Sequence, residues 1–381
     1  MILAKDQLTG LLDHLSTGQA RLYVPARVDA TSRFALYGPG IKTAFNLVST
    51  MMPPKDLLFP QTQKMYRYGF DAEGVPFIDP VHDDDEVIAF GLRPCDMASI
   101  DCMDEVFLTK GYADEFYTPR REKLLTVVIG CTAPAETCFC SSMGGATDAA
   151  PTADIQLNET TDGAAYTVKA HTEKGEAALS DWETFTSDGD GDPIKASCSL
   201  VVSMDGIKEK LDTMYDHPLW ERIARKCVTC GTCTYVCPTC HCFDIGQNNR
   251  MKEGERFRSW DSCMFSSYTL MAGHHNPRAD KMPRVRQRFL HKLCFFEDRY
   301  GRSLCVGCGR CVEKCPVALD ITELIDEIGA LDLPSATDAS RATDVPRATD
   351  APGATDAPPA VASAASVADA PPAMTAKEVG A

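Results

Sequence analysis

The chain has 381 residues, of which 44% are hydrophobic and 24% are charged, an ordinary composition for a globular protein with room for two domains. The formal net charge of −16 argues against general nucleic-acid binding. No apolar run is long enough to span a bilayer, and the first residues lack the features of a secretion signal, so we expect a cytoplasmic protein.

The sequence contains 18 cysteines, which is the feature that most restricts its function. In a cytoplasmic protein, so many cysteines indicate metal or redox chemistry rather than disulfide bonds. The first eighty residues contribute none of them and have no motif with a mechanism. They predict a short helix with leucines at helical spacing and strand-like pieces such as residues 21–24.

Residues 86–130 predict a β-α-β unit. Two short apolar strands, residues 86–91 and 123–130, flank a segment with helical spacing at residues 96–107. The two strands should therefore be parallel, with their carboxyl ends at one edge of a sheet, where α/β proteins usually build their sites. A hairpin follows at residues 155–169, and residues 199–203 are expected to form one more strand. We predict an α/β domain over residues 1–204.

Four cysteines should converge on this sheet edge. They follow the two predicted strands closely in the chain and are Cys95, Cys131, Cys138 and Cys140. Four converging thiols suggest a [4Fe-4S] cluster, with positive charge from Arg93, Arg120 and Arg121 nearby. A structural zinc ion and unmetallated buried thiols are the alternatives. Cys102 and Cys198 are expected to be core thiols.

The most specific motif is a pair of Cys-x2-Cys-x2-Cys-x3-Cys-Pro runs at residues 227–238 and 305–316. This is the ligand pattern of two-cluster ferredoxins, in which the fourth cysteine of each run ligates the other cluster. The pattern assigns Cys227, Cys230, Cys233 and Cys315 to one [4Fe-4S] cluster. It assigns Cys305, Cys308, Cys311 and Cys237 to the second. Zinc would need two separated ligand pairs, and disulfides would need an oxidising compartment, so neither alternative fits the doubled run.

A long insert separates the two runs within a predicted helical domain over residues 205–333. Residues 250–292 contain ten Lys or Arg and four acidic residues, which indicates a docking patch, charge that offsets the clusters, or a solvated basic helix face. Cys240, Cys242 and Cys263 have no place among the eight ligands, and we interpret them as buried thiols near the clusters, with Cys240 as an alternative ligand in place of Cys237. His274, His275 and His291 are interpreted as ordinary polar groups.

The end of the chain changes in composition. An amphipathic helix is predicted over residues 317–328, and hexads containing Ala-Thr-Asp then lead into a sequence rich in proline and alanine. Such a segment cannot bury enough apolar surface to fold, so residues 334–381 are predicted to be a disordered tail.

The chain resembles the electron-transfer subunit of anaerobic sulfite reductase and the β subunit of cytoplasmic sulfhydrogenases, which are NAD(P)-linked nickel–iron hydrogenases. The matching motifs lie at residues 93–96, 131–144, 217–220, 237–242, 271–274 and 305–311. Together they span roughly residues 86–320 and are far more specific than a ferredoxin motif alone. The first eighty residues match weakly.

The resemblance implies a subunit that passes electrons and turns over no substrate of its own. In the family, a flavin-containing subunit reacts with NAD(P)H, and the receiving subunit carries siroheme or a nickel–iron centre. We therefore expect a hetero-oligomer with two, or with the sheet-edge cysteines three, [4Fe-4S] clusters. The alternative is a self-contained iron–sulfur enzyme with its own flavin or substrate site, although the sequence has no G-x-G-x-x-G or P-loop to bind a nucleotide.

Overall fold

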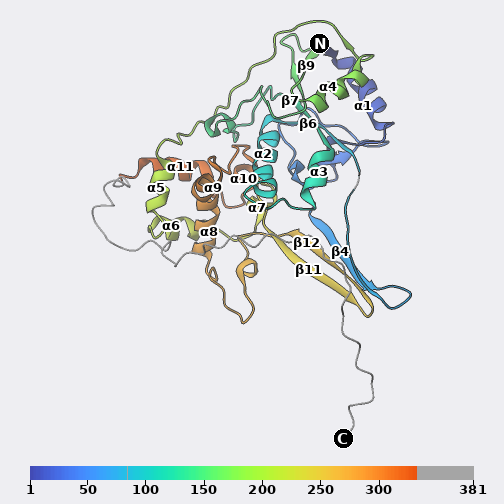
Figure 1. Ribbon diagram of the computed structural model, residues 1–381. Helices are drawn as coiled ribbons and strands as arrows, with labels where there is room; N and C mark the ends of the chain where they lie inside the picture. The colour runs from blue at the N-terminus through green and yellow to red at the C-terminus, as the bar shows by residue number, and fades with distance from the viewer. Residues whose placement is uncertain (84, 333–381) are drawn as a thin grey trace. The chain divides into compact units, whose positions relative to one another are not determined.

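The computed structural model describes residues 1–83 and 85–332, so the predicted disordered tail lies outside the described residues (Figure 1). The larger sheet consists of β1 (Ile2–Ala4), β2 (Arg21–Val28), β3 (Thr31–Leu36), β6 (Val87–Leu92), β7 (Leu124–Ile129), β8 (Ile155–Glu159), β9 (Ala165–Ala170) and β10 (Thr186–Ser187). Its order is β10-β1-β9-β8-β7-β6-β2-β3. The β2–β6, β6–β7 and β7–β8 pairs are parallel, and the other pairs are antiparallel.

The predicted β-α-β unit is present. Strands β6 and β7 pair in parallel, and α2 (Pro94–Leu108) connects them through α3 (Tyr117–Lys123). The hairpin is also confirmed as the antiparallel pair β8 and β9. The strand predicted at residues 199–203 is wrong: this stretch forms no ladder, and its Val202 N–H instead donates to the Ser142 hydroxyl oxygen at 3.1 Å. Val202 is buried among the helices of the ferredoxin-type region, so its burial does not depend on a sheet.

Alternating side chains of the central strands supply two separate apolar layers. On β7, Val127 and Ile129 face a core that includes α1 (Leu8–Ser16), Trp182 and residues next to α4 (Glu173–Leu179). Leu124 and Val128 face the other core, which α2 and Tyr117 cover. The sheet is therefore packed on both faces, as expected where parallel strands are central.

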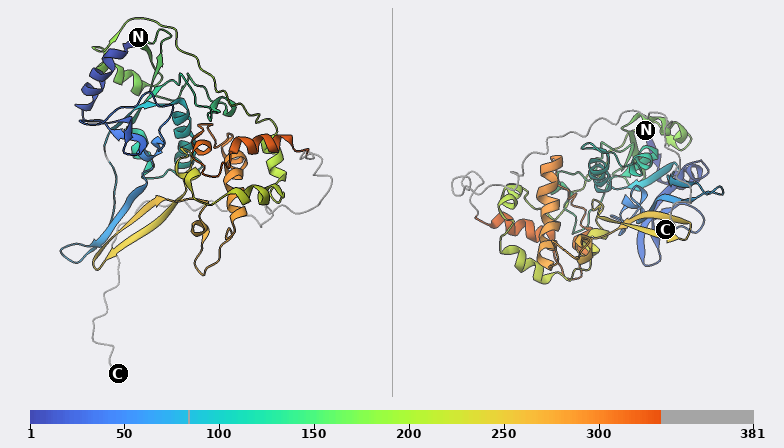
Figure 2. Two further views of the ribbon diagram at one scale, coloured as in Figure 1. Left: turned by 180° about the vertical axis from the view of Figure 1, so that it is seen from behind. Right: turned by 60° about the horizontal axis from the view of Figure 1, so that its bottom comes forward.

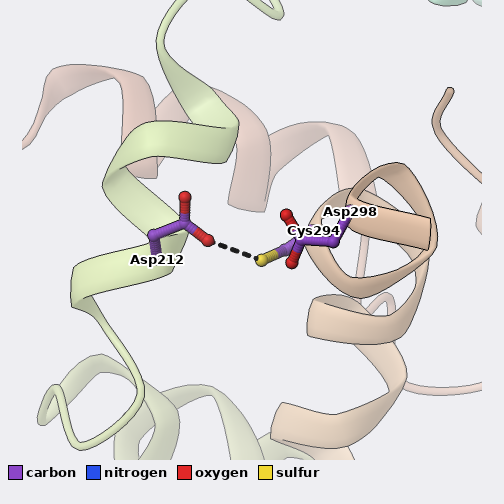
Figure 3. Close-up of side chains that lie close together, drawn as sticks. All are labelled: Asp212, Cys294 and Asp298. Carbon is purple, nitrogen blue, oxygen red and sulfur yellow. Dashed lines mark hydrogen bonds between the residues drawn. The ribbon is translucent and has the colours of Figure 1, made fainter. Parts of the chain in front are cut away.

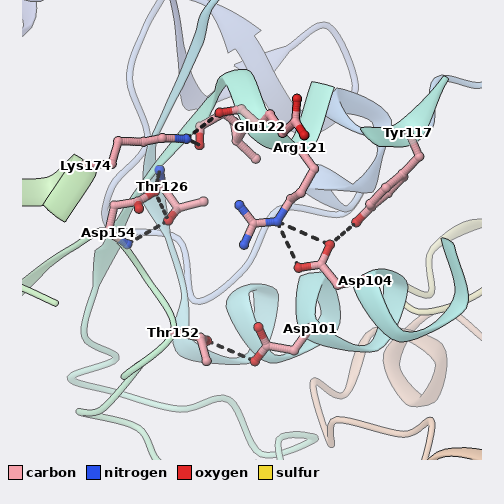
Figure 4. A network of polar contacts seen from close by, with 10 residues as sticks. Asp101, Asp104, Tyr117, Arg121, Glu122, Thr126, Thr152, Asp154 and Lys174 are labelled. Atoms are coloured by element: carbon pink, nitrogen blue, oxygen red, sulfur yellow. Dashed lines mark hydrogen bonds and ion pairs between the residues drawn. The ribbon is translucent and has the colours of Figure 1, made fainter. Parts of the chain in front are cut away.

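A polar network fastens α2, α3 and β7 together beside the second core (Figure 4). The Arg121 Nε donates to both carboxylate oxygens of Asp104, at 2.9 and 3.2 Å, and the Tyr117 hydroxyl donates to the same carboxylate at 2.7 Å. On β7, the backbone N–H and hydroxyl of Thr126 both donate to Asp154, each at 2.8 Å. The contacts of Asp104 tie α3 to α2, and those of Asp154 tie the middle of β7 to the residue before β8.

The insert between the ferredoxin-type runs is predicted to be helical, but it begins as a β-hairpin. The smaller sheet has the order β11-β12-β4-β5, with β4 (Thr62–Phe70), β5 (Pro76–Pro80), β11 (Phe243–Arg250) and β12 (Glu253–Trp260). Figure 2 shows the two hairpins side by side. Residues of β12, such as Phe257, Arg258 and Ser259, pair with β4, which lies on the other side of the predicted boundary at residue 204. That boundary stays a prediction.

Short helices around a third apolar core form the rest of the chain. The helices are α5 (Ile207–Thr213), α6 (Leu219–Lys226), α7 (Thr232–Tyr235), α8 (Lys281–Leu290), α9 (Phe296–Tyr300), α10 (Arg310–Glu313) and α11 (Ile321–Ala330), with a π-helical turn η6 (His291–Phe295) between α8 and α9. Trp220, Phe289 and Ile325 are among the buried side chains of this core. Across the described part of the chain, every helix is too short or too polar to cross a membrane.

A buried ion pair joins the smaller sheet to the α/β part. Arg258 is only 1% exposed, and its guanidinium donates to both oxygens of Asp114, at 2.6 and 3.1 Å, and to the Gln63 side-chain oxygen at 2.8 Å. The rings of Phe59 and Phe107 lie within 5.6 Å of it. A buried ion pair contributes little net free energy to folding, but removing one partner leaves an uncompensated buried charge and strongly destabilises the fold.

Asp114→Asn is therefore expected to destabilise the protein by about 3–5 kcal/mol, because it leaves Arg258 buried without a counter-charge. Anaerobic denaturant unfolding followed by circular dichroism measures the change. The matched control is Asp85→Asn, since Asp85 forms an exposed ion pair with Arg21 and should hardly affect the midpoint. An equally small effect of both substitutions would show that Arg258 does not depend on Asp114.

Candidate metal centres

The structure gathers Cys227, Cys230, Cys233 and Cys315 around one pocket, and we call them the first cysteine group. Three come from the loop that enters α7, and Cys315 comes from the end of the other run. Backbone N–H groups donate to two of the sulfurs: Thr229 to Cys227 at 3.3 Å and Leu319 to Cys315 at 3.2 Å. These contacts orient the two sulfurs at the pocket.

The second cysteine group consists of Cys237, Cys305, Cys308 and Cys311. Cys237 lies close enough to the other three for its charge to raise the pKa of each thiol. Burial is the larger cause, and it raises the pKa of Cys305 to about 11 and that of Cys311 to about 12. Burial therefore opposes ionisation of Cys305, Cys308 and Cys311, whereas a hydrogen bond from Cys240 and the charge of Lys292 hold the pKa of Cys237 well below its ordinary value. Metal binding would remove the protons of the first three thiols.

The spacing of the sulfurs distinguishes these groups from a single-ion site. Over the residues that the structure describes, three ligand atoms lie within 4.8 Å of one another in one place only, at Asp212, Cys294 and Asp298 (Figure 3). There the Lys208 ammonium pairs with both carboxylates, at 2.7 Å each, so their negative charge is already compensated without a metal ion. The ferredoxin-type cysteines are spread more widely than one tetrahedral zinc ion requires, as a larger cofactor would need.

Buried positive charge surrounds both groups. Arg288 lines the pocket of the first group and is 3% exposed, and its Nε and Nη2 have no hydrogen-bond partner. Burial opposes its charge, but the Cys233 and Cys311 thiolates raise its pKa still further above the ordinary value. Unpaired buried donors are rare, so these two are well placed to face the sulfur atoms of a cofactor. The residues therefore fit iron–sulfur clusters.

Lys292 contacts the second group directly. Its ammonium donates to the Cys237 sulfur at 3.1 Å and to the Thr239 hydroxyl oxygen at 3.2 Å, and the side chain is 3% exposed. Burial opposes its charge, but the Cys237 and Cys240 thiolates keep its pKa well above the ordinary value. A second buried lysine, Lys55, donates to the Cys240 carbonyl oxygen at 2.8 Å.

These positions correct the interpretation of the basic insert as a solvated helix face. Five of its ten basic residues are buried: Arg258, Arg284, Arg286, Arg288 and Lys292. Two of them, Arg288 and Lys292, have cysteine thiolates as electrostatic neighbours, so this part of the insert places positive charge beside the first and second cysteine groups.

Arg310, inside the second run, connects this run to α2. Its Nη2 donates to Asp96 at 2.7 Å and its Nε to the Thr50 carbonyl oxygen at 2.7 Å, while Nη1 has no partner. Arg310 and Asp96 are each 2% exposed in their side chains. Burial opposes the charge of Arg310, but Asp96 and the Cys308 thiolate raise its pKa above the ordinary value.

The structure brings the sheet-edge cysteines together with a fifth thiol. Cys138, Cys140 and Cys198 form one buried cluster, and Cys95 packs against it. Cys131 lies close enough to Cys138 and Cys140 to contribute to the pKa of each, although burial is the larger cause. We call Cys95, Cys131, Cys138 and Cys140 the third cysteine group. The prediction of Cys198 as a core thiol is confirmed, but its place beside this group was not predicted, since its spacing from the other four follows no motif.

The third group adjoins the second through backbone contact. The Phe139 N–H donates to the Gly307 carbonyl oxygen at 2.9 Å, and the Cys138 sulfur lies 3.9 Å from the Cys308 carbonyl oxygen. Gly307 has φ +64°, and a Cβ there would lie 2.6 Å from the backbone of Cys140. Only glycine permits this conformation and this approach.

Of the three arginines predicted to supply positive charge to the third group, Arg93 does lie near it. Burial raises the pKa of Cys131, and the charge of Arg93 lowers it. Arg120 and Arg121 instead pair with Asp83 and Asp104, so their prediction as counter-charges for the third group is wrong.

The unassigned cysteines differ in burial. Cys102 and Cys240 are buried, whereas Cys242 and Cys263 are partly exposed. His291 packs with its ring edge against His241, at 5.5 Å between ring centroids. Lys55, Arg310 and Lys292 are the site residues that the sequence did not single out, and only Lys292 lay in a segment noted for its charge.

Comparison with known proteins agrees with this geometry. Residues 226–319 match the family model of a 4Fe-4S dicluster domain, which supports iron–sulfur clusters, two [4Fe-4S] clusters among them. The chain is 30% identical over 320 residues to "Sulfhydrogenase 2 subunit beta" of Pyrococcus furiosus, an alignment that covers 81% of this chain and 92% of the relative. No solved structure matches the chain.

Lys292→Met should lower the reduction potential of one cluster, because it removes the buried cation nearest to the Cys237 sulfur. A hydrogen bond to a charged group contributes ~1.5–3 kcal/mol, and ~1.4 kcal/mol is a tenfold change in an equilibrium, so we expect a shift of about 60 mV or more for one electron. A redox titration followed by electron paramagnetic resonance measures it. The control is Lys252→Met, at an exposed position of the hairpin turn, and equal potentials in both variants would contradict the assignment.

Proposed function

The chain belongs to the family of sulfhydrogenase β subunits, and on that basis we propose that it relays electrons between a flavin-containing, NAD(P)H-linked subunit and a catalytic subunit. The relative's name describes a subunit of a sulfhydrogenase, which supports a hydrogenase-type catalytic partner rather than one that carries siroheme. The doubled cysteine run, with both groups assembled across the two runs, is the observation on which the proposal depends.

The first and second cysteine groups would hold the two [4Fe-4S] clusters of the dicluster domain, with Cys315 and Cys237 exchanged between the runs. Each bound cluster takes up and releases one electron. The chain's own residues exclude water from the clusters, offset their negative charge through Arg288 and Lys292, and donate hydrogen bonds to the ligand sulfurs. These are the means by which a protein sets a cluster's potential.

We further propose that the third group, Cys95, Cys131, Cys138 and Cys140, holds a third [4Fe-4S] cluster. Its burial and its positive neighbours Arg93 and Arg310 support a charged cofactor there. Arg310 has Cys95 and Cys308 as neighbours, and so its charge serves the third and second groups together.

The contacts support a row in which the second group lies between the other two. Arg288 has Cys233 of the first group and Cys311 of the second as neighbours, and the loops of the second and third groups are in backbone contact. Cys230 is the exposed cysteine among the twelve ligands, and Val228 beside it is 57% exposed. The first group is thus the end at which a partner can approach most closely.

The relay role is tested by purifying the chain anaerobically, alone and with its native partners. Alone it should show no flavin absorbance and should not be reduced by NAD(P)H, whereas its clusters should be reduced by NAD(P)H in the complex. A bound flavin in the isolated chain, or NAD(P)H oxidation without partners, would instead support a self-contained enzyme.

The third cluster predicts about twelve irons and twelve acid-labile sulfides per chain, four for each cubane. Cys131→Ala should lower both to about eight, because it removes a ligand of the third group. Cys102→Ala is the control, since Cys102 is a buried thiol of α2 outside the third group and its removal should leave all irons in place. A wild-type chain with about eight irons would show that the third group holds no cluster.

A further inference from the structure

Cys198 is the buried thiol nearest to the third group that the proposed ligands leave unused. Its sulfur lies 3.6 Å from the Cys140 sulfur, within hydrogen-bond distance for two sulfur atoms. The two residues are 6% and 9% exposed, so water does not compete for this contact.

The position of Cys198 is fixed on both sides in the chain. The Thr147 hydroxyl donates to the Ala196 carbonyl oxygen at 2.6 Å, two residues before Cys198. The Val202 N–H donates to the Ser142 hydroxyl oxygen at 3.1 Å, four residues after it. Ser142 itself belongs to the turn that follows Cys140, so the segment around Cys198 is tied to the loop that it contacts.

The state of Cys140 determines which way the hydrogen bond can run. By geometry alone, either sulfur could be the donor in this contact. A Cys140 that binds iron has no proton, so the Cys140 sulfur can only accept.

Neither a disulfide nor a fifth iron ligand accounts for the contact. A disulfide bond is about 2.05 Å long, far shorter than the separation between Cys140 and Cys198. A cubane takes four cysteines, each on its own iron, and the edge of the cube keeps two ligand sulfurs further apart than a direct sulfur–sulfur contact. The third group already supplies four ligands.

We propose that Cys198 is a positioning residue of the third centre, whose S–H donates to the Cys140 sulfur and thereby raises the reduction potential of the cluster. The inference rests on the proposed third cluster. The partial positive charge of the S–H stabilises the extra electron that the reduced cluster spreads onto its ligands, which is how hydrogen bonds to ligand sulfurs tune such centres.

The test compares wild type, Cys198→Ala and Cys198→Ser by iron content and by a redox titration followed by electron paramagnetic resonance. The signal of the third centre is identified by its absence from Cys131→Ala. Cys198→Ala should keep about twelve irons and lower the midpoint potential of this signal by ~59 mV. For one electron, this shift is a tenfold change in the reduction equilibrium. Cys198→Ser keeps a donor in the same place and should recover most of the wild-type midpoint.

Two results would overturn the inference while the third cluster stands. A drop to about eight irons in both Cys198 variants would show that Cys198 is itself an iron ligand. An unchanged midpoint potential in Cys198→Ala would show that the contact between Cys198 and Cys140 does not affect the potential. About eight irons in the wild type would instead overturn the proposed third cluster. Cys102→Ala, which removes a buried thiol that faces the Ser303 carbonyl oxygen, should change neither quantity.

Discussion

Buried positive charge is the constraint on which the metal-binding part of this protein depends. Thiolate-ligated clusters are negative, and a negative group removed from water is stable only beside compensating charge. Arg288, Lys292 and Arg310 are each at most 3% exposed, and each lies next to at least one of the cysteines. Two of them also have side-chain nitrogens without a partner, which is costly unless a cofactor accepts those hydrogen bonds.

The same constraint explains why the α/β part and the ferredoxin-type part are built together. Arg310 belongs to the second run, but its ion pair is with Asp96 at the start of α2. Gly307 and Gly309 bring that run against residues 137–140, at a distance that no side chain would permit. The β-α-β unit and the loop after it therefore carry the third cysteine group and also pack against the loop of the second group.

Much of this arrangement could be predicted from local pattern. The doubled cysteine runs and the strand–helix–strand spacing of residues 86–130 each have a short-range signature, and the strands and the helix are where the sequence placed them. The hairpin at residues 243–260 could not be recognised, since its partner β4 lies about 190 residues earlier and its polar residues resemble a solvated helix. The place of Cys198 beside the third group was missed for a related reason: what makes it significant is a contact with Cys140, 58 residues away.

The basic insert shows how one pattern can have two physical meanings. Along α8 and η6, Arg288 and Lys292 are four residues apart, and Phe289 and Leu293 follow them at the same spacing. Such a helix resembles one with a core face and a solvent face. Here, however, both stripes are buried: the apolar stripe packs in the helical core, and the basic stripe faces the cysteines. The decisive difference is the position of the thiolates. A basic helix beside the eight cysteines of the doubled run has anionic sulfurs to face when they bind metal, and its charges can therefore be buried where an ordinary core would exclude them.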